Sequence, residues 1–380
     1  MNLPAGHPPV VAPRVGVLLV NLGTPDAPTT KAVRRYLKEF LSDPRVVEIP
    51  RLVWWPILNG IILNVRPRKS AHAYAQVWGA DGSPLATITK GQADGLQARL
   101  GQGIMVRWAM RYGNPAIGTV LGEMKAAGCE RILVAPLYPQ YSGATTATVI
   151  DELGRQLAAM RWQPSTRTLP PYYDDALHIA ALRDDIARQV RSLPFVPEVL
   201  LLSFHGMPDR TLHLGDPYHC QCRKTARLVG EALRAEFPAL RIETSFQSRF
   251  GRAKWLEPYT EETLTALAKG GVRRLAIAAP GFSADCLETR EELASGRTLA
   301  IGNLLIADFP GRDQAIGHLI DGMEIMANLR GCHAIAIDLD GNAGCERTHL
   351  DQRAGRKRTV EVFAPGAPDR GRGGEPPRPF

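Results

Sequence analysis

The chain has 380 residues, of which 44% are hydrophobic and 22% charged, a composition typical of a soluble protein with one large or two smaller α/β domains. Its formal net charge of +8 suits an anionic ligand or an acidic membrane surface, but no stripe of Lys and Arg with interleaved aromatic residues indicates nucleic-acid binding. Six irregularly spaced cysteines, and prolines where a signal peptide would have its apolar core, predict a cytoplasmic protein without a disulfide framework.

The chain opens with a Pro-rich stretch, residues 1–13, which is predicted to be a mobile lead-in. From Val15 onward, a run of apolar residues predicts a buried strand that ends near Gly23. Thr29 can then cap a helix, because its hydroxyl accepts a backbone hydrogen bond and apolar residues recur at helical spacing after it. A strand followed by a helix is the start of an α/β fold.

Residues 52–65 form an apolar segment flanked by basic residues on both sides. The segment is too short, and too interrupted by a proline and a glycine, to span a bilayer. It is either an exposed lip around an apolar pocket, with its basic flanks in contact with a membrane surface, or a buried core segment. The pair Trp54 and Trp55 favours the lip, because indole rings prefer boundaries where the N–H stays in water.

The second half of the chain repeats the first. Three short motifs recur in the same order: NLGTP at 21–25 and FHGMP at 204–208, RYG at 111–113 and RFG at 249–251, AAGCERILVA at 126–135 and KGGVRRLAIA at 269–278. The offset between the halves is 183 at the first motif and 138 and 143 at the other two, so the first half carries about 45 extra residues where the apolar segment lies. The repeat predicts two similar α/β units, one of which is decorated by a lip.

Titratable side chains follow two predicted strands of the second half. His205 comes at the end of a strand that is apolar on both faces, and Asp285 and Glu288 follow another buried strand, spaced so that one helical turn would put both carboxylates on one face. Parallel strands place their carboxyl ends at one binding edge. Such an imidazole and carboxylates could hold a divalent metal that is to be passed on, or remove protons. The alternatives are a loop-capping histidine and a solvated helix start.

The order of several motifs resembles the ferrochelatase family from about Val15 to Leu293. These motifs are NLGTP, GSPL, MRYGNP, LYPQYS, SFHGMP, GDPY, QSRFG and PGFSADCLET. The resemblance implies two similar Rossmann-like domains, with parallel sheets flanked by helices and a porphyrin cleft between them, in a monomer or a weak dimer. The first domain would span residues 14–172 and the second, with the metal site, residues 173–314. The activity implied is that of a lyase that inserts Fe²⁺ into protoporphyrin IX, giving protohaem in the last step of haem biosynthesis.

Carried over by position, the resemblance implies that His205 and Glu288 bind the iron with support from Asp285. Which of His205 and Glu288 accepts the pyrrole protons stays open. The residues implied to line the porphyrin pocket, together with the lip, are Arg111, Tyr112 and Tyr138. Iron enters this scheme as a substrate, and the lip offers a peripheral contact with the inner membrane.

No nucleotide is expected, because the stretch NLGTPDAP after the first strand lacks the G-x-G-x-x-G spacing. An iron–sulfur cluster is disfavoured. The family's cluster arrangement takes a cysteine where this chain has Gly143 and three more near the C-terminus, where this chain has only Cys332 and Cys345. Two alternatives to ferrochelatase activity stay open: a non-catalytic porphyrin- or haem-binding paralogue, and a chelatase for another metal or tetrapyrrole. The choice between protoporphyrin and coproporphyrin also stays open.

The resemblance weakens after Leu293. Residues 295–312 lack the family's I-P-x-L-N strand, residues 315–329 resemble its closing helix, and residues 330–380 have the Gly/Pro/Arg-rich composition of a disordered tail. We hypothesise that the reading frame is disturbed between about residues 294 and 317, which would deprive the second sheet of an edge strand, and a second disturbance in the tail, residues 330–380, stays open. A single clean frame on resequencing, together with full activity, would remove this hypothesis.

Overall fold

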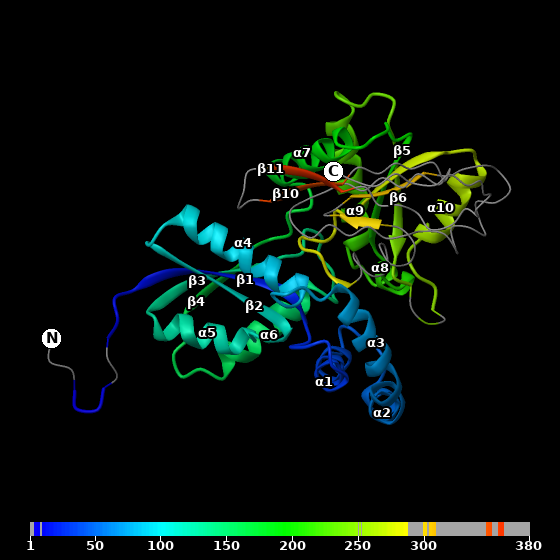
Figure 1. Ribbon diagram of the computed structural model, residues 1–380. Coiled ribbons are helices and arrows are strands. Elements are labelled where there is room, and N and C mark those ends of the chain that lie inside the picture. Colours follow the sequence, from blue (N-terminus) through cyan, green and yellow to red (C-terminus); the bar gives the residue numbers. More distant parts are fainter. Residues whose placement is uncertain are drawn as a thin grey trace, which may run out of the picture. The chain divides into compact units, whose positions relative to one another are not determined.

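The computed structural model describes residues 4–7, 10–249, 251, 253–287, 299–301, 304–308, 347–351 and 356–360. The chain divides into two units, Met1–Ile337 and Asp338–Phe380. The larger unit contains two separate sheets with helices packed on them, and the smaller unit contains one pair of strands (Figure 1).

The first sheet is parallel throughout, in the order β2-β1-β3-β4. The elements of this half are β1 (Arg14–Thr24), α1 (Thr30–Leu41), α2 (Arg51–Ile57), the π-helix η1 (Leu58–Ile62), α3 (Leu63–Val77), α4 (Pro84–Leu100), β2 (Ile104–Gly113), α5 (Ile117–Ala126), β3 (Cys129–Pro136), α6 (Thr146–Ala158) and β4 (Ser165–Thr168). Thr29 caps α1 as predicted, because its hydroxyl accepts the backbone N–H of Ala32 at 3.3 Å.

The second sheet has the order β6-β5-β7-β9-β8, in which β6, β5 and β7 are parallel and the last two strands are antiparallel to their neighbours. Its elements are α7 (Ala176–Arg191), β5 (Val199–His205), α8 (Asp209–His213), α9 (Tyr218–Leu233), β6 (Arg241–Gln247), α10 (Thr260–Lys269), β7 (Arg274–Ala278), β8 (Leu299–Ile301) and β9 (Leu304–Asp308). The predicted α/β class, with parallel sheets flanked by helices, is confirmed.

The sequence repeat is also a structural repeat. In each half the strand that begins the repeat lies in the middle: β1 between β2 and β3, and β5 between β6 and β7. Both central strands are buried on both faces, and Leu200, Leu201 and Leu202 of β5 are fully buried. The halves differ beyond this core, because β4 runs parallel to β3 whereas β9 runs antiparallel to β7. That difference falls where the sequence motifs weaken.

Two glycines of the repeat are explained by a close approach of backbones. Gly23 has a φ of 124°, and a Cβ at this position would lie 1.8 Å from the carbonyl oxygen of Tyr112. Gly206 donates its N–H to the carbonyl oxygen of Gln247 at 2.7 Å, and a Cβ there would lie 2.7 Å from the same oxygen. In both halves the chain leaving the central strand runs against the neighbouring strand, where no side chain fits.

The apolar segment 52–65 runs through α2, η1 and the start of α3, and each interpretation of it holds in part. Leu58 and Leu63 are buried in the core of the first half. The apolar residues that the segment leaves exposed are Leu52, Val53, Trp55, Ile61 and Val65. The expectation for Trp54 is wrong, because its indole N–H donates to the carbonyl oxygen of Leu41 at 2.7 Å instead of to water. Within the described residues, none of the helices combines the length and the apolar character needed to cross a bilayer.

The strands β1 to β4 fall within the predicted range 14–172 and β5 to β9 within 173–314. The predicted closing helix at 315–329 lies outside the described residues. The predicted tail, 330–380, contains the antiparallel pair β10 (Arg347–Asp351) and β11 (Arg356–Val360). The rest of that stretch also lies outside the described residues, and the disorder predicted there stays a prediction.

The close approach at Gly23 generates a stability prediction. We expect Gly23→Ala to lower the free energy of unfolding by about 3 kcal/mol or more. The alanine would have to adopt a positive φ, and its Cβ would clash with the backbone of Tyr112. The matched control is Gly122→Ala inside α5, where a Cβ meets no atom within 4 Å and should stabilise the protein by about 0.5–1 kcal/mol. Urea unfolding followed by circular dichroism measures both, and equal stabilities would contradict the argument.

Candidate functional site

His205 stands at the carboxyl end of β5, the central strand of the second sheet, and is half-buried. Its Nδ1 lies 2.6 Å from the carbonyl oxygen of Gly206. Because a carbonyl only accepts, this contact places the proton of the neutral ring on Nδ1 and leaves the lone pair of Nε2 available. The local structure therefore prepares Nε2 to bind a metal ion or to accept a proton.

Asp285 lies at the same edge of the second sheet, because it follows β7, the parallel neighbour of β5. It is only 9% exposed. The ring of Phe282, three residues earlier, lies 6.3 Å from the His205 ring between centroids. Glu288 lies outside the described residues. The part of the chain that the structure describes contains no cluster of three or more His, Cys, Asp or Glu that could hold a metal ion, so the pairing of His205 with Glu288 stays a prediction.

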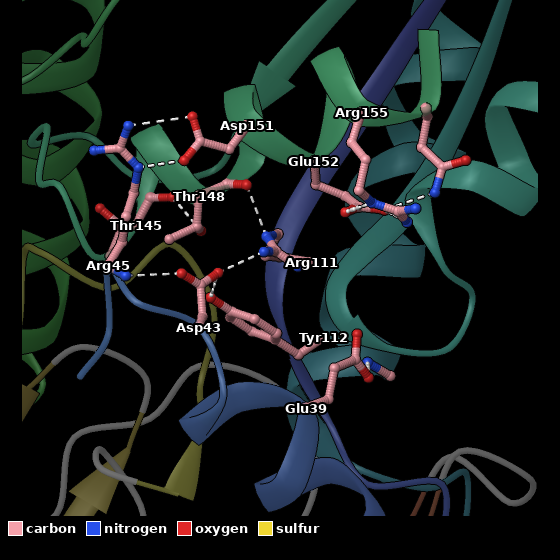
Figure 2. A network of polar contacts seen from close by, with 12 residues as sticks. Glu39, Asp43, Arg45, Arg111, Tyr112, Thr145, Thr148, Asp151, Glu152 and Arg155 are labelled. Carbon is pink, nitrogen blue, oxygen red and sulfur yellow. Dashed lines mark hydrogen bonds and ion pairs between the residues drawn. The ribbon is translucent and has the colours of Figure 1, made fainter. Parts of the chain in front are cut away.

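Arg111 and Tyr112 stand at the carboxyl end of β2, and both bind Asp43, which follows α1 (Figure 2). Arg111 Nη2 lies 2.5 Å from Asp43 Oδ2, and its Nε donates to the carbonyl oxygen of Thr148 at 2.7 Å. The Tyr112 hydroxyl donates to the same Asp43 oxygen at 2.9 Å. Tyr112 is fully buried, and burial raises the pKa of its phenol. Both residues thus contact protein atoms, and their contact with a porphyrin stays a prediction.

Further charges surround this cluster and tie it to α1 and α6. Asp151 of α6 forms an ion pair with Arg45, which lies just after Asp43 in the chain. Glu39 of α1 accepts the backbone N–H of Gly113 at 3.0 Å, and burial raises the pKa of its carboxyl group. The carboxyl end of β2, the loop after α1 and the helix α6 are therefore joined by polar contacts, which are part-buried around Arg111 and exposed at Arg45 and Asp151 (Figure 2).

Tyr138 follows β3 and has a buried hydroxyl with no hydrogen-bond partner among the described residues. Burial raises the pKa of this phenol well above its ordinary value, so the group is protonated at neutral pH. A buried hydroxyl that makes no hydrogen bond costs about 1–3 kcal/mol of stability. Of the two predicted pocket tyrosines, Tyr138 is thus the one whose hydroxyl makes no hydrogen bond to the described residues.

The loops at the carboxyl ends of the two sheets are hydrogen-bonded to each other. Ser283, two residues before Asp285, donates its hydroxyl to the carbonyl oxygen of Leu137 at 2.6 Å. Gly143, in the loop after Tyr138, donates its N–H to Asp216 Oδ2 at 2.6 Å. The first bond connects the loop that carries the predicted metal-site carboxylates to the stretch that carries Tyr138, and the second connects the loop after Tyr138 to the turn between α8 and α9.

The sequence reasoning missed Asp43. Its partner Arg111 lies 68 residues away, so no local pattern reveals the pair. The available signal was an aspartate that comes directly after the apolar spacing of α1 ends and just before the lip, a place where an acidic side chain is not needed to cap the helix. Arg111 itself was identified, although as a pocket residue and not as half of an internal ion pair.

Comparisons with known proteins cover strands of both sheets of the larger unit. A model of the ferrochelatase family matches residues 14–303. The chain belongs to the ferrochelatase family. The ferrochelatase of Aromatoleum aromaticum is 54% identical over 288 residues, which are 74% of this chain and 77% of the relative. That of Rhizobium meliloti is 52% identical over 298 residues, or 77% and 87% of the two chains.

Membership of the ferrochelatase family confirms the resemblance drawn from the motifs, and with it a lyase class whose members insert iron into porphyrin. The family match ends at residue 303, inside the stretch where the reading frame is hypothesised to be disturbed. A solved structure, SirB from Bacillus subtilis with Fe3+, covers 68% of this chain at 14% identity with a TM-score of 0.39, a likeness too distant to bear on the site.

We expect removal of the hydroxyl to affect stability differently at the two tyrosines, Tyr138 and Tyr112. Tyr138→Phe removes an unpartnered hydroxyl and should leave the melting temperature unchanged or raise it, whereas Tyr112→Phe removes a bond to Asp43 and should cost about 1–2 kcal/mol. Thermal unfolding of both variants checks the expectation. If Tyr138→Phe is the less stable of the two, the assignment of a free hydroxyl is wrong.

Proposed function

We propose that the chain is itself a ferrochelatase, which inserts Fe²⁺ into protoporphyrin IX and releases two pyrrole protons to give protohaem. The observation that carries the proposal is the family match over residues 14–303, which spans both sheets and the His205 edge. The iron is a substrate in this reaction, and the site has to hold it only until it is transferred.

In the proposed mechanism His205 acts through Nε2, whose lone pair the Gly206 contact leaves available. Nε2 either accepts a pyrrole proton or ligates the incoming iron, and Glu288 takes the other task. Asp285, at the same sheet edge, adds negative charge that favours a cation there. A porphyrin held in a bent shape exposes its nitrogen lone pairs, and contacts elsewhere on the ring have to supply about 1–5 kcal/mol for that strain.

The proposed porphyrin site lies in a cleft between the two α/β domains, lined by Arg111, Tyr112, Tyr138 and the lip. Tyr138 supports this placement by its position, because it follows β3 at the carboxyl edge of the first sheet. Arg111 and Tyr112 contribute as a wall of fixed shape, because Asp43 holds both of them.

We further propose that the lip makes a peripheral contact with the cytoplasmic face of the inner membrane. Leu52 and Val65 are 92% and 71% exposed, although they are large apolar side chains. Arg51 and the basic stretch 66–69 flank them and would meet the anionic headgroups. A helical segment with these two features lies in an interface without crossing the membrane.

An anaerobic assay with Fe²⁺ and protoporphyrin tests the proposed activity. We expect the wild-type protein to convert the porphyrin spectrum to that of the metalloporphyrin, and His205→Ala to lose at least about 100-fold in turnover with porphyrin binding retained. The control is His213→Ala, because His213 is an exposed histidine on α8 outside the proposed site. A spectrum that shifts on binding but never converts would mean a non-catalytic porphyrin-binding protein and would refute the proposal.

Vesicle co-sedimentation tests the membrane contact. The double variant Leu52→Ser/Val65→Ser should bind anionic phospholipid vesicles at least about tenfold more weakly than wild type, because it removes apolar area from the interface. The matched control is Leu177→Ser/Val196→Ser in the second half, where two similarly exposed apolar residues, at 81% and 68%, lie away from the lip. Equal losses in both double variants would show that the lip is not the contact.

A further inference from the structure

The Asp43 carboxylate accepts three hydrogen bonds beside the proposed porphyrin site. Its side chain is 9% exposed. Oδ2 accepts from Arg111 Nη2 at 2.5 Å and from the Tyr112 hydroxyl at 2.9 Å, and Oδ1 accepts from the backbone N–H of Arg45 at 2.9 Å. Both oxygens are thus used, and the carboxylate is held by two side chains of β2 and by the backbone of its own loop (Figure 2).

These contacts determine how much positive charge Arg111 offers to a bound ligand. The guanidinium is 11% exposed, and its positive charge is compensated by Asp43 at 2.5 Å. Its Nε is also occupied by the Thr148 carbonyl, and the group lies 4.2 Å from the centre of the Tyr112 ring. An arginine with a free fork would bind a carboxylate strongly, but the Nε and Nη2 edge of this guanidinium is already used.

The wider surroundings of Arg111 are not positive either. Figure 2 shows the charged groups around it, which are the cations Arg45, Arg111 and Arg155 and the carboxylates Glu39, Asp43, Asp151 and Glu152. Each of the other two arginines is paired with a carboxylate of α6. A carboxylate brought to this end of the site would meet no uncompensated cation, and it would lose hydration in the process.

We propose that Asp43 is a specificity-determining positioning residue: by neutralising Arg111 it makes this end of the site accept the apolar edge of a porphyrin and reject a propionate. The inference rests on the proposed function. Protoporphyrin carries its two carboxylates on one edge and apolar substituents on the other, whereas coproporphyrin carries carboxylates on both edges. The chain should therefore prefer a dicarboxylate porphyrin to a tetracarboxylate one. Asp43 acts through Arg111 and needs no contact with the substrate.

The test compares kcat/KM for protoporphyrin and coproporphyrin III with Zn²⁺ at pH 8. Asp43→Asn keeps the size of the side chain and removes its charge, which should shift the ratio toward the tetracarboxylate by about fivefold. Asp43→Glu, which restores the charge, should return the ratio toward the wild-type value. The charge-matched control is Asp94→Asn, which breaks an exposed pair with Lys90 on α4 and should leave the ratio unchanged.

A second variant keeps the test decisive if Asp43→Asn does not fold. Arg111→Gln leaves the buried carboxylate without its cation and should shift the ratio the other way, further against the tetracarboxylate. Porphyrin binding followed by fluorescence gives the same comparison without turnover. A merely structural role for Asp43 would lower both kcat/KM values together and would not change their ratio.

The outcomes separate this inference from the proposed function. If the wild-type protein metallates no porphyrin, the proposed function fails. If it metallates protoporphyrin but already prefers coproporphyrin III, or if neither folded variant changes the ratio, the role of Asp43 is wrong and the chelatase activity stands.

Discussion

The burial of β1 and β5 on both faces is the constraint on which the rest of the structure depends. A strand covered on both faces carries its polar side chains toward its carboxyl end, as Asn21 and Ser203 show, so the groups that do chemistry are expected where the strand ends. His205 occupies that place in the second sheet. Gly23 and Gly206 show how tightly the ends are held, since the chain leaving each central strand runs against the neighbouring strand without space for a Cβ.

The two halves use the same strand order for different chemistry. At the carboxyl edge of the second sheet stand an imidazole with an available Nε2 and a nearly buried aspartate, which are groups for a cation and for protons. At the corresponding edge of the first sheet, the arginine and the tyrosine are bound to an internal carboxylate. Reactive groups thus gather on one sheet, and on the other sheet polar groups are locked to one another. In the proposed function, the porphyrin lies between an edge with reactive groups and an edge whose polar groups are already bound to one another.

Much of the fold could be predicted from the sequence, because its signals are local. Apolar runs identified the buried strands, Thr29 identified a helix start, and three short motifs identified the repeat that the strand order later displayed. The position of His205 at a strand end followed from the same patterns.

What could not be predicted depends on partners distant in the chain. The ion pair of Asp43 with Arg111 joins residues 68 positions apart, and the indole of Trp54 finds a carbonyl in the preceding helix and not water. The antiparallel course of β9 also has no local signature, since its apolar residues would suit either direction.

The lip lies within the connection between β1 and β2, so changes in the lip are separate from changes in the pairing of these strands. Those two strands pair from Val15↔Ile104 to Thr24↔Gly113 whatever path the chain takes between them. The entropy lost in closing a longer connection grows only slowly with its length. The segment proposed to meet the membrane can therefore be lengthened, shortened or exchanged while the register of the first sheet remains as it is.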